Sequence, residues 1–146
     1  MASLAACQPS ASSAVELGQS PAGLEQMRIT IDSHGKKHPF TVEVARTLEQ
    51  QAQGLMFRSA LDPDRGMIFP FETARQASFW MKNTLIPLDL IFIRTDGSIA
   101  NIAANAVPLS LEPIYSDGEV EAVLEIAGGR SAELGVQAGD KVEWKR

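Results

Sequence analysis

The chain has 146 residues, of which 45% are hydrophobic and 21% are charged, and these values fit a single small globular domain. Its formal net charge of −5 and pI near 5.0 argue against nucleic acid as a partner, because the longest basic runs are the pairs Lys36-Lys37 and Lys145-Arg146. One cysteine allows no disulfide within the chain, and we expect a monomer that needs no metal or cofactor.

The N-terminal segment Leu4-Ala5-Ala6-Cys7 has the form of a bacterial lipoprotein cleavage and acylation box. Only Met1-Ala2-Ser3 precedes it, whereas a signal peptide needs roughly 7 to 15 apolar residues, so the box implies a longer natural precursor. In this interpretation Cys7 carries a lipid, which is the only link to a membrane, and the domain works at the cell envelope or in the periplasm. In the alternative, Cys7 is a free thiol and the chain as written stays cytoplasmic.

Residues 8 to 27 are rich in Gln, Ser, Ala, Gly and Pro and show no apolar period, which indicates a flexible tether. The sequence therefore predicts a tether over residues 1–27 and a single β-rich domain over residues 28–146. No apolar run approaches the roughly 18 residues of a transmembrane helix.

The first ordered element is predicted to be a β-hairpin. Phe40, Val42 and Val44 alternate with polar or small residues, as in a strand with one buried face, and residues 28–32 should pair with it across residues 33–37. We expect His34 and His38 to be solvated at this turn. After the hairpin, a capping box at residues 47–50 predicts a helix over residues 48–53 that ends at Gly54, and residues 61–66 should form an irregular loop.

A second hairpin is centred on Asp96-Gly97, for which a two-residue type I′ turn is predicted. This turn would pair Arg94 with Ile99, Ile93 with Ala100, and Ile91 with Ile102. A further strand is indicated over residues 120–126. Its acids, Glu119, Glu121 and Glu125, would form a solvated outer face.

The chain should end with a short helix that Ser131 caps and Gly135 closes, followed by a strand over residues 141–145. The elements together predict a mainly β fold, either a small β-sandwich or a partly closed, jelly-roll-like barrel, with two short helices. Turns rather than crossover helices between strands argue against a doubly wound α/β fold.

The stretch from Phe79 to Asp89 sets polar groups inside an apolar sequence, where an unpaired buried polar group would cost about 1 to 3 kcal/mol. These groups must either satisfy one another or meet a ligand. Our hypothesis is that one concave site is lined by Arg58, Trp80, Lys82, Asn83, Thr84 and Asp89.

Each candidate also has a structural interpretation. Asp89 enters a strand, where a carboxylate more often accepts backbone amides than catalyses, and Trp80 beside Phe and Met is more often a core residue. Arg58 could clamp an anionic ligand or neutralise Asp89. The methionines at positions 56, 67 and 81 suggest copper(I), but no cysteine or histidine accompanies them, so we predict no metal site.

Four blocks, residues 54–58, 66–69, 79–89 and 135–142, resemble the domain of unknown function 192 family over roughly residues 28–146. The resemblance implies a compact β-rich domain of bacteria and archaea, often secreted or envelope-associated, with no established activity. Three functions stay open: a non-catalytic accessory module that binds a small polar or glycan ligand, which we favour; a hydrolase or lyase that uses Asp89; and an interaction or stability factor for an envelope protein.

Overall fold

The computed structural model describes residues 17–146, so Cys7 and the lipid predicted for it lie outside the described residues. The strands are β1 (Gln26–Ser33), β2 (Lys36–Val44), β3 (Arg65–Phe79), β4 (Leu88–Ile93), β5 (Ile99–Ala106), β6 (Ile114–Ala127) and β7 (Lys141–Glu143), and the helices are α1 (Leu48–Gln53) and α2 (Arg130–Leu134). None of the helices in this part of the chain is long and apolar enough to span a bilayer.

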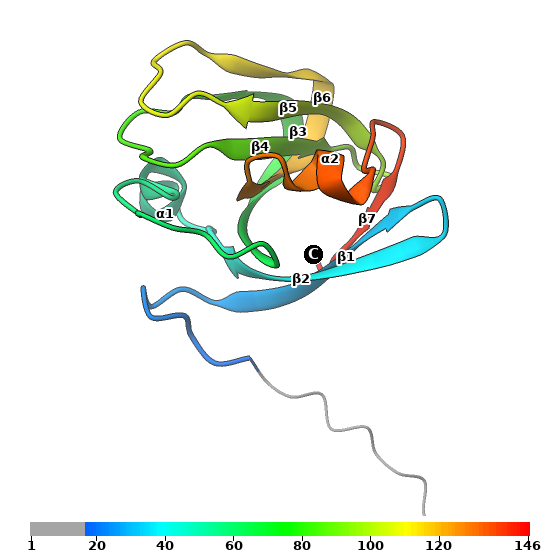
Figure 1. The fold of residues 1–146 in the computed structure, drawn as a ribbon, viewed down its shortest axis with the longest axis horizontal. Helices are drawn as coiled ribbons and strands as arrows, with labels where there is room; N and C mark the ends of the chain where they lie inside the picture. Colours follow the sequence, from blue (N-terminus) through cyan, green and yellow to red (C-terminus); the bar gives the residue numbers. More distant parts are fainter. Residues whose placement is uncertain (1–16) are drawn as a thin grey trace, which may run out of the picture.

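The seven strands form one curled sheet in the order β5-β4-β6-β3-β2-β1-β7 (Figure 1). An isolated bridge between Ser98 and Lys141 joins the start of β5 to β7, so the two edges of the sheet meet at one end. The predicted mainly β fold with two short helices is therefore confirmed, in its form of a partly closed barrel.

Neighbouring strands run antiparallel except β2 and β3, which are parallel. Parallel neighbours need a crossover, and α1 lies within it. The capping box predicted for α1 is present: the Thr47 hydroxyl accepts the Gln50 N–H at 3.0 Å, and the Gln50 side chain accepts the Thr47 N–H at 3.2 Å. Although α1 has no buried residue, Gln51 fixes it by donating to the carbonyls of Ala45 and Pro70.

The β1–β2 hairpin forms as predicted, with His34 and Gly35 in the left-handed region at its turn. The expectation of a solvated His38 is wrong, because β2 begins earlier, at Lys36, and the inward alternation of Phe40 continues to His38. His38 lies opposite the buried Ile31, and its Nε2 atom is buried without a hydrogen-bond partner among the described residues.

The β4–β5 hairpin has a different turn from the predicted one. Only Gly97 has a positive φ there, and its N–H donates to the Arg94 carbonyl at 2.9 Å, which makes a three-residue loop instead of a type I′ turn. Ile91 pairs with Ile102 as predicted, but Ile93 pairs with Ile99, so the predicted partners of Ile93 and Arg94 are wrong. The longer loop shifts the pairing of β4 with β5 by one residue at Ile93, and a bulge between Ile93 and Phe92 restores the predicted pairing.

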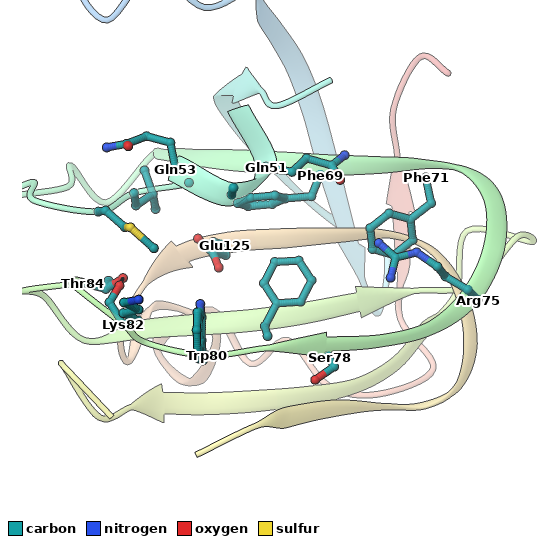
Figure 2. A pocket seen from close by; sticks show the side chains of 15 residues that line it. Gln51, Gln53, Phe69, Phe71, Arg75, Ser78, Trp80, Lys82, Thr84 and Glu125 are labelled. Atoms are coloured by element: carbon teal, nitrogen blue, oxygen red, sulfur yellow. Dashed lines mark hydrogen bonds between the residues drawn. The ribbon is translucent and has the colours of Figure 1, made fainter. Parts of the chain in front are cut away.

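The sheet buries both of its faces at the centre. The cluster inside the curl contains alternate residues of β6, Ala122, Leu124 and Ile126, as the sequence predicted. A second cluster on the outer face contains Met67, Phe69, Leu90 and Val123. This outer face is covered because β3 bends back between Pro70 and Arg75, where its register with β6 shifts (Figure 2). The central strands therefore have no broad solvated side.

The prediction that Ser131 caps the helix α2 is wrong, because the helix begins two residues earlier, at Arg130, with Gly129 as its N-cap. The Asp89 carboxylate on β4 accepts the N–H groups of Gly129 and Ser131 at 3.0 and 2.9 Å, so a residue distant in sequence supplies the capping oxygens. Gly135, in the left-handed region, closes the helix as predicted.

Candidate functional site

A pocket of about 180 Å³ lies between α1, the two arms of β3, and β6 (Figure 2). This volume is below the roughly 300 to 1,000 Å³ of pockets for drug-sized ligands, so the space suits a smaller molecule. Its polar side chains come from separate parts of the chain. They include Gln51, Gln53, Arg75, Ser78, Lys82, Thr84 and Glu125, and the aromatic walls are Phe69, Phe71, Phe79 and Trp80.

Glu125 supplies the only carboxyl group in the lining of this pocket. It lies on the central strand β6 between Met67 of β3 and Leu90 of β4, and only 5% of the residue is exposed. No hydrogen bond or ion pair within residues 17–146 involves its side chain. Burial raises the pKa of Glu125 from 4.5 to about 8, so the carboxyl keeps its proton at neutral pH and can donate a hydrogen bond.

The predicted solvated outer face of β6 is therefore wrong at Glu125. Glu119 is exposed, and Glu121 forms an ion pair with Arg146 at 2.6 Å. Glu125 is buried because the returning arm of β3 and α1 cover this end of the strand. The sequence held one signal of this: Val123, on the same predicted outer face, is apolar and indicates that this face is not fully open to water.

Trp80 follows the last residue of β3 and is 50% exposed at the pocket, rather than being the core residue that its neighbours suggested. The Lys82 ammonium lies 5.1 Å from the centroid of the Trp80 ring system. In Figure 2 the Glu125 carboxyl lies between Phe69 and Trp80. An indole surface and an unpartnered carboxyl therefore border the same small space.

The aromatic wall beside Trp80 is fixed by edge contacts between rings. The rings of Phe69 and Phe79 meet at 88° with centroids 5.1 Å apart, and Phe79 meets Phe92 at 6.4 Å. The Arg75 guanidinium lies 4.0 Å above the Phe71 ring. Neither Arg75 nor the phenylalanines gave a functional signal in the sequence, since only the bend of β3 brings them together.

Thr84 also lines the pocket, but its hydroxyl donates to the Lys82 carbonyl at 3.2 Å, which shapes the loop. Asn83 is not part of the pocket lining. It adopts a left-handed conformation with φ of 54°, and its carbonyl accepts the Phe57 N–H at 2.8 Å. The structure thus brings Trp80, Lys82 and Thr84 of the predicted set together in one pocket, whereas Asn83 does not line it.

Asp89 lies apart from the pocket lining and is completely buried. Besides the two amides at the start of α2, its carboxylate accepts the Asn105 N–H at 2.9 Å and a hydrogen bond from the Ser131 hydroxyl. Three backbone amides and one hydroxyl therefore occupy its acceptor positions. The position of these partners, up to 42 residues away along the chain, could not be derived from the sequence.

Arg58 is likewise separate from the pocket and does not meet Asp89. Its guanidinium forms an ion pair with Glu43 at 2.6 Å, in which the two side chains are 29% and 12% exposed. It borders two other hollows of the surface, and neither contains another member of the predicted set.

The three methionines do not share one environment. Met67 and Met81 are completely buried in the outer apolar cluster, whereas Met56 is half-buried and lines the pocket. Within the part of the chain that the structure describes, no group of three His, Cys, Asp or Glu side chains could hold a metal ion.

The chain belongs to the domain of unknown function 192 family of uncharacterised proteins, whose sequence profile matches residues 29–144. It is similar to a crystal structure of a Novosphingobium aromaticivorans DSM 12444 protein of unknown function, with 44% identity, a TM-score of 0.86, and coverage of 96% of this chain and 100% of that chain.

A second similar structure is from Sinorhizobium meliloti 1021, with 43% identity, a TM-score of 0.81, and coverage of 83% of this chain and 95% of that chain. A role as a transcription regulator has been suggested for that protein. No curated protein matches the chain.

Proposed function

We propose that the protein is a non-catalytic accessory module of the cell envelope whose pocket binds a small polar ligand built on a sugar ring. The observation that carries the proposal is the buried Glu125 carboxyl, which has no partner within the described residues and faces a pocket beside the half-exposed Trp80. A sugar supplies hydroxyl groups for the carboxyl and an apolar ring face for the indole.

Binding has more support than hydrolysis or elimination. Most glycoside hydrolases need two carboxyl groups, but Glu125 is the only one in the pocket lining. The lining contains no cysteine or histidine that could act as a nucleophile or base. The alternative enzyme that uses Asp89 is disfavoured because that carboxylate is buried and already accepts four hydrogen bonds.

A protein-interaction role is a second candidate, supported by exposed apolar side chains on the two loops next to the pocket. Leu85 belongs to the first loop and Val107, Leu109 and Leu111 to the second, and all are at least 48% exposed. The loops are joined by hydrogen bonds from Leu109 to the carbonyl of Thr84 and from Met81 to that of Ser110. A pull-down from envelope extract that succeeds equally with a Leu109→Ser, Leu111→Ser double variant would count against this role.

The role suggested for the Sinorhizobium meliloti protein is not adopted for this chain. Binding to a nucleic acid backbone depends on a basic surface, whereas this chain has a net charge of −5.

The envelope location depends on a lipid at Cys7. Mass spectrometry of the protein isolated from membranes of its source cells tests whether that residue carries a lipid.

The binding function is tested by proton–nitrogen NMR of the full chain titrated with monosaccharides. The chain has two tryptophans, so the indole N–H resonance of Trp80 reports on the pocket and that of Trp144 serves as an internal control. We expect saturable movement of the Trp80 resonance alone. Trp80→Ala and Glu125→Gln should weaken binding, as followed by the neighbouring backbone resonances.

The matched control for these variants is Tyr115→Ala, which removes a 56% exposed aromatic side chain of β6 that does not line the pocket. It should leave sugar binding unchanged. If no monosaccharide shifts the Trp80 resonance at millimolar concentration, or if both tryptophans shift alike, the proposed binding function is wrong.

A further inference from the structure

The pocket carries two positive charges that no carboxylate among the described residues neutralises. Arg75 and Lys82 both line it, and neither belongs to any of the ion pairs of residues 17–146. Among the other arginines of residues 17–146, Arg46, Arg58, Arg130 and Arg146 lie within 3.0 Å of a carboxylate oxygen. Arg28, Arg65 and Arg94 form no ion pair, but none of them lines this pocket. The two cations of the pocket are thus free to meet a ligand.

Both cations are held against the aromatic wall instead of being paired. The Arg75 guanidinium lies over Phe71, and the Lys82 ammonium lies over Trp80. A cation–π contact orients a cation but leaves its hydrogen-bond donors available. Figure 2 shows Arg75 and Lys82 on opposite sides of Glu125, so the two charges flank the space between them.

Glu125 does not cancel these charges at neutral pH. Burial in the pocket favours its neutral form, so the lining has a net positive charge within a chain of net charge −5. A neutral carboxyl donates a hydrogen bond to an anionic or hydroxyl oxygen and does not repel it. The electrostatics of the pocket therefore favour an anion, in contrast to those of the whole chain.

We propose that the ligand of this pocket is an acidic sugar unit, whose ring packs on Trp80 and whose anionic group meets the Lys82 ammonium. The inference rests on the proposed sugar-binding function and narrows its ligand class. Lys82 is the cation beside the indole, whereas Arg75 adds positive potential from the other end of the pocket. A carboxylate, as in a uronic acid, and a phosphate, as in a sugar phosphate, share this chemistry.

The test compares glucose, glucuronate and glucose 6-phosphate by the same NMR titration of the full chain at low salt. We expect at least one acidic sugar to have a dissociation constant about tenfold lower than that of glucose, with the difference shrinking as salt screens the charges. Comparison of the dissociation constants of glucuronate and glucose 6-phosphate identifies whether a carboxylate or a phosphate is preferred.

Lys82→Gln should remove most of the preference for the acidic sugar and bring its affinity close to that for glucose. Arg75→Gln should lower the preference by a smaller factor. The matched control is Lys36→Gln, which removes an exposed, unpaired lysine at the start of β2, outside the pocket, and should preserve the preference.

The two proposals fail in different ways. Equal affinity of the wild-type protein for glucose and both acidic sugars overturns the acidic-ligand inference but leaves the sugar-binding function standing. An acidic preference that Lys82→Gln leaves undiminished also overturns the inference. Absence of any shift of the Trp80 resonance with all three sugars overturns the binding function itself.

Discussion

The substitution Glu125→Gln tests the buried carboxyl directly, through the pH dependence of stability. In the unfolded chain Glu125 ionises near its ordinary pKa of 4.5, whereas in the folded protein burial raises this pKa to about 8. Between these values the unfolded chain loses the proton that the folded protein keeps. Stability from this group is thus full at low pH and declines as pH rises from 4.5 towards 8.

The magnitude follows from a cost of about 1.4 kcal/mol for each pH unit between the two pKa values. At about pH 7 the loss in the wild-type protein amounts to about 3 kcal/mol, and glutamine avoids it because an amide does not ionise. We therefore expect Glu125→Gln to match the wild-type protein in stability near pH 4 and to exceed it by about 3 kcal/mol near pH 7.

The assay is urea unfolding of both proteins across this pH range, with the free energy of unfolding extrapolated to water. The control Glu119→Gln removes an exposed glutamate of the same strand and should not change the pH dependence. A stability difference between Glu125→Gln and wild type that stays constant with pH would refute the reasoning, because it would mean that folding does not perturb the ionisation of Glu125.

Three further substitutions, all outside the pocket lining, test contacts that stabilise the fold, and each is measured by urea unfolding. Asp89→Asn places an amide donor against backbone N–H groups and should cost about 2 to 4 kcal/mol, whereas the exposed Asp117→Asn should cost little. Gly66→Ala would set a Cβ atom 2.3 Å from a β6 carbonyl oxygen and should cost about 3 kcal/mol or more; Gly18→Ala, in open space, should be neutral. Thr47→Ala removes the cap of α1 and should cost about 1 kcal/mol; an unchanged stability would mean that the cap is dispensable.

Features that depend on neighbouring residues were predictable from the sequence. The capping box of α1 lies within four residues, and the inward positions of Ala122, Leu124 and Ile126 follow from the period of a strand. The hairpin at Asp96-Gly97 was predictable in place but not in turn type. The backbone of Asp96 avoids the positive φ that a type I′ turn requires, and the register of Ile93 shifts as a result.

The candidate site was only partly predictable. Trp80, Lys82 and Thr84 are close in sequence, so their common place in the pocket follows from a short loop. Asp89 lies outside the pocket because its carboxylate accepts the N–H groups at the start of α2. Arg58 pairs with Glu43, a partner that no local pattern indicates. Each of these long-range partners is set by how distant strands come together.

The sequence by itself determined the mainly β fold, its two short helices and the family, because periodicity, turns and caps are local properties. Only the tertiary structure decided that Glu125 faces a pocket instead of water. The physical reason is that β3 bends back and, together with α1, covers the outer face of β6, and burial depends on what covers a strand as well as on the strand's own alternation.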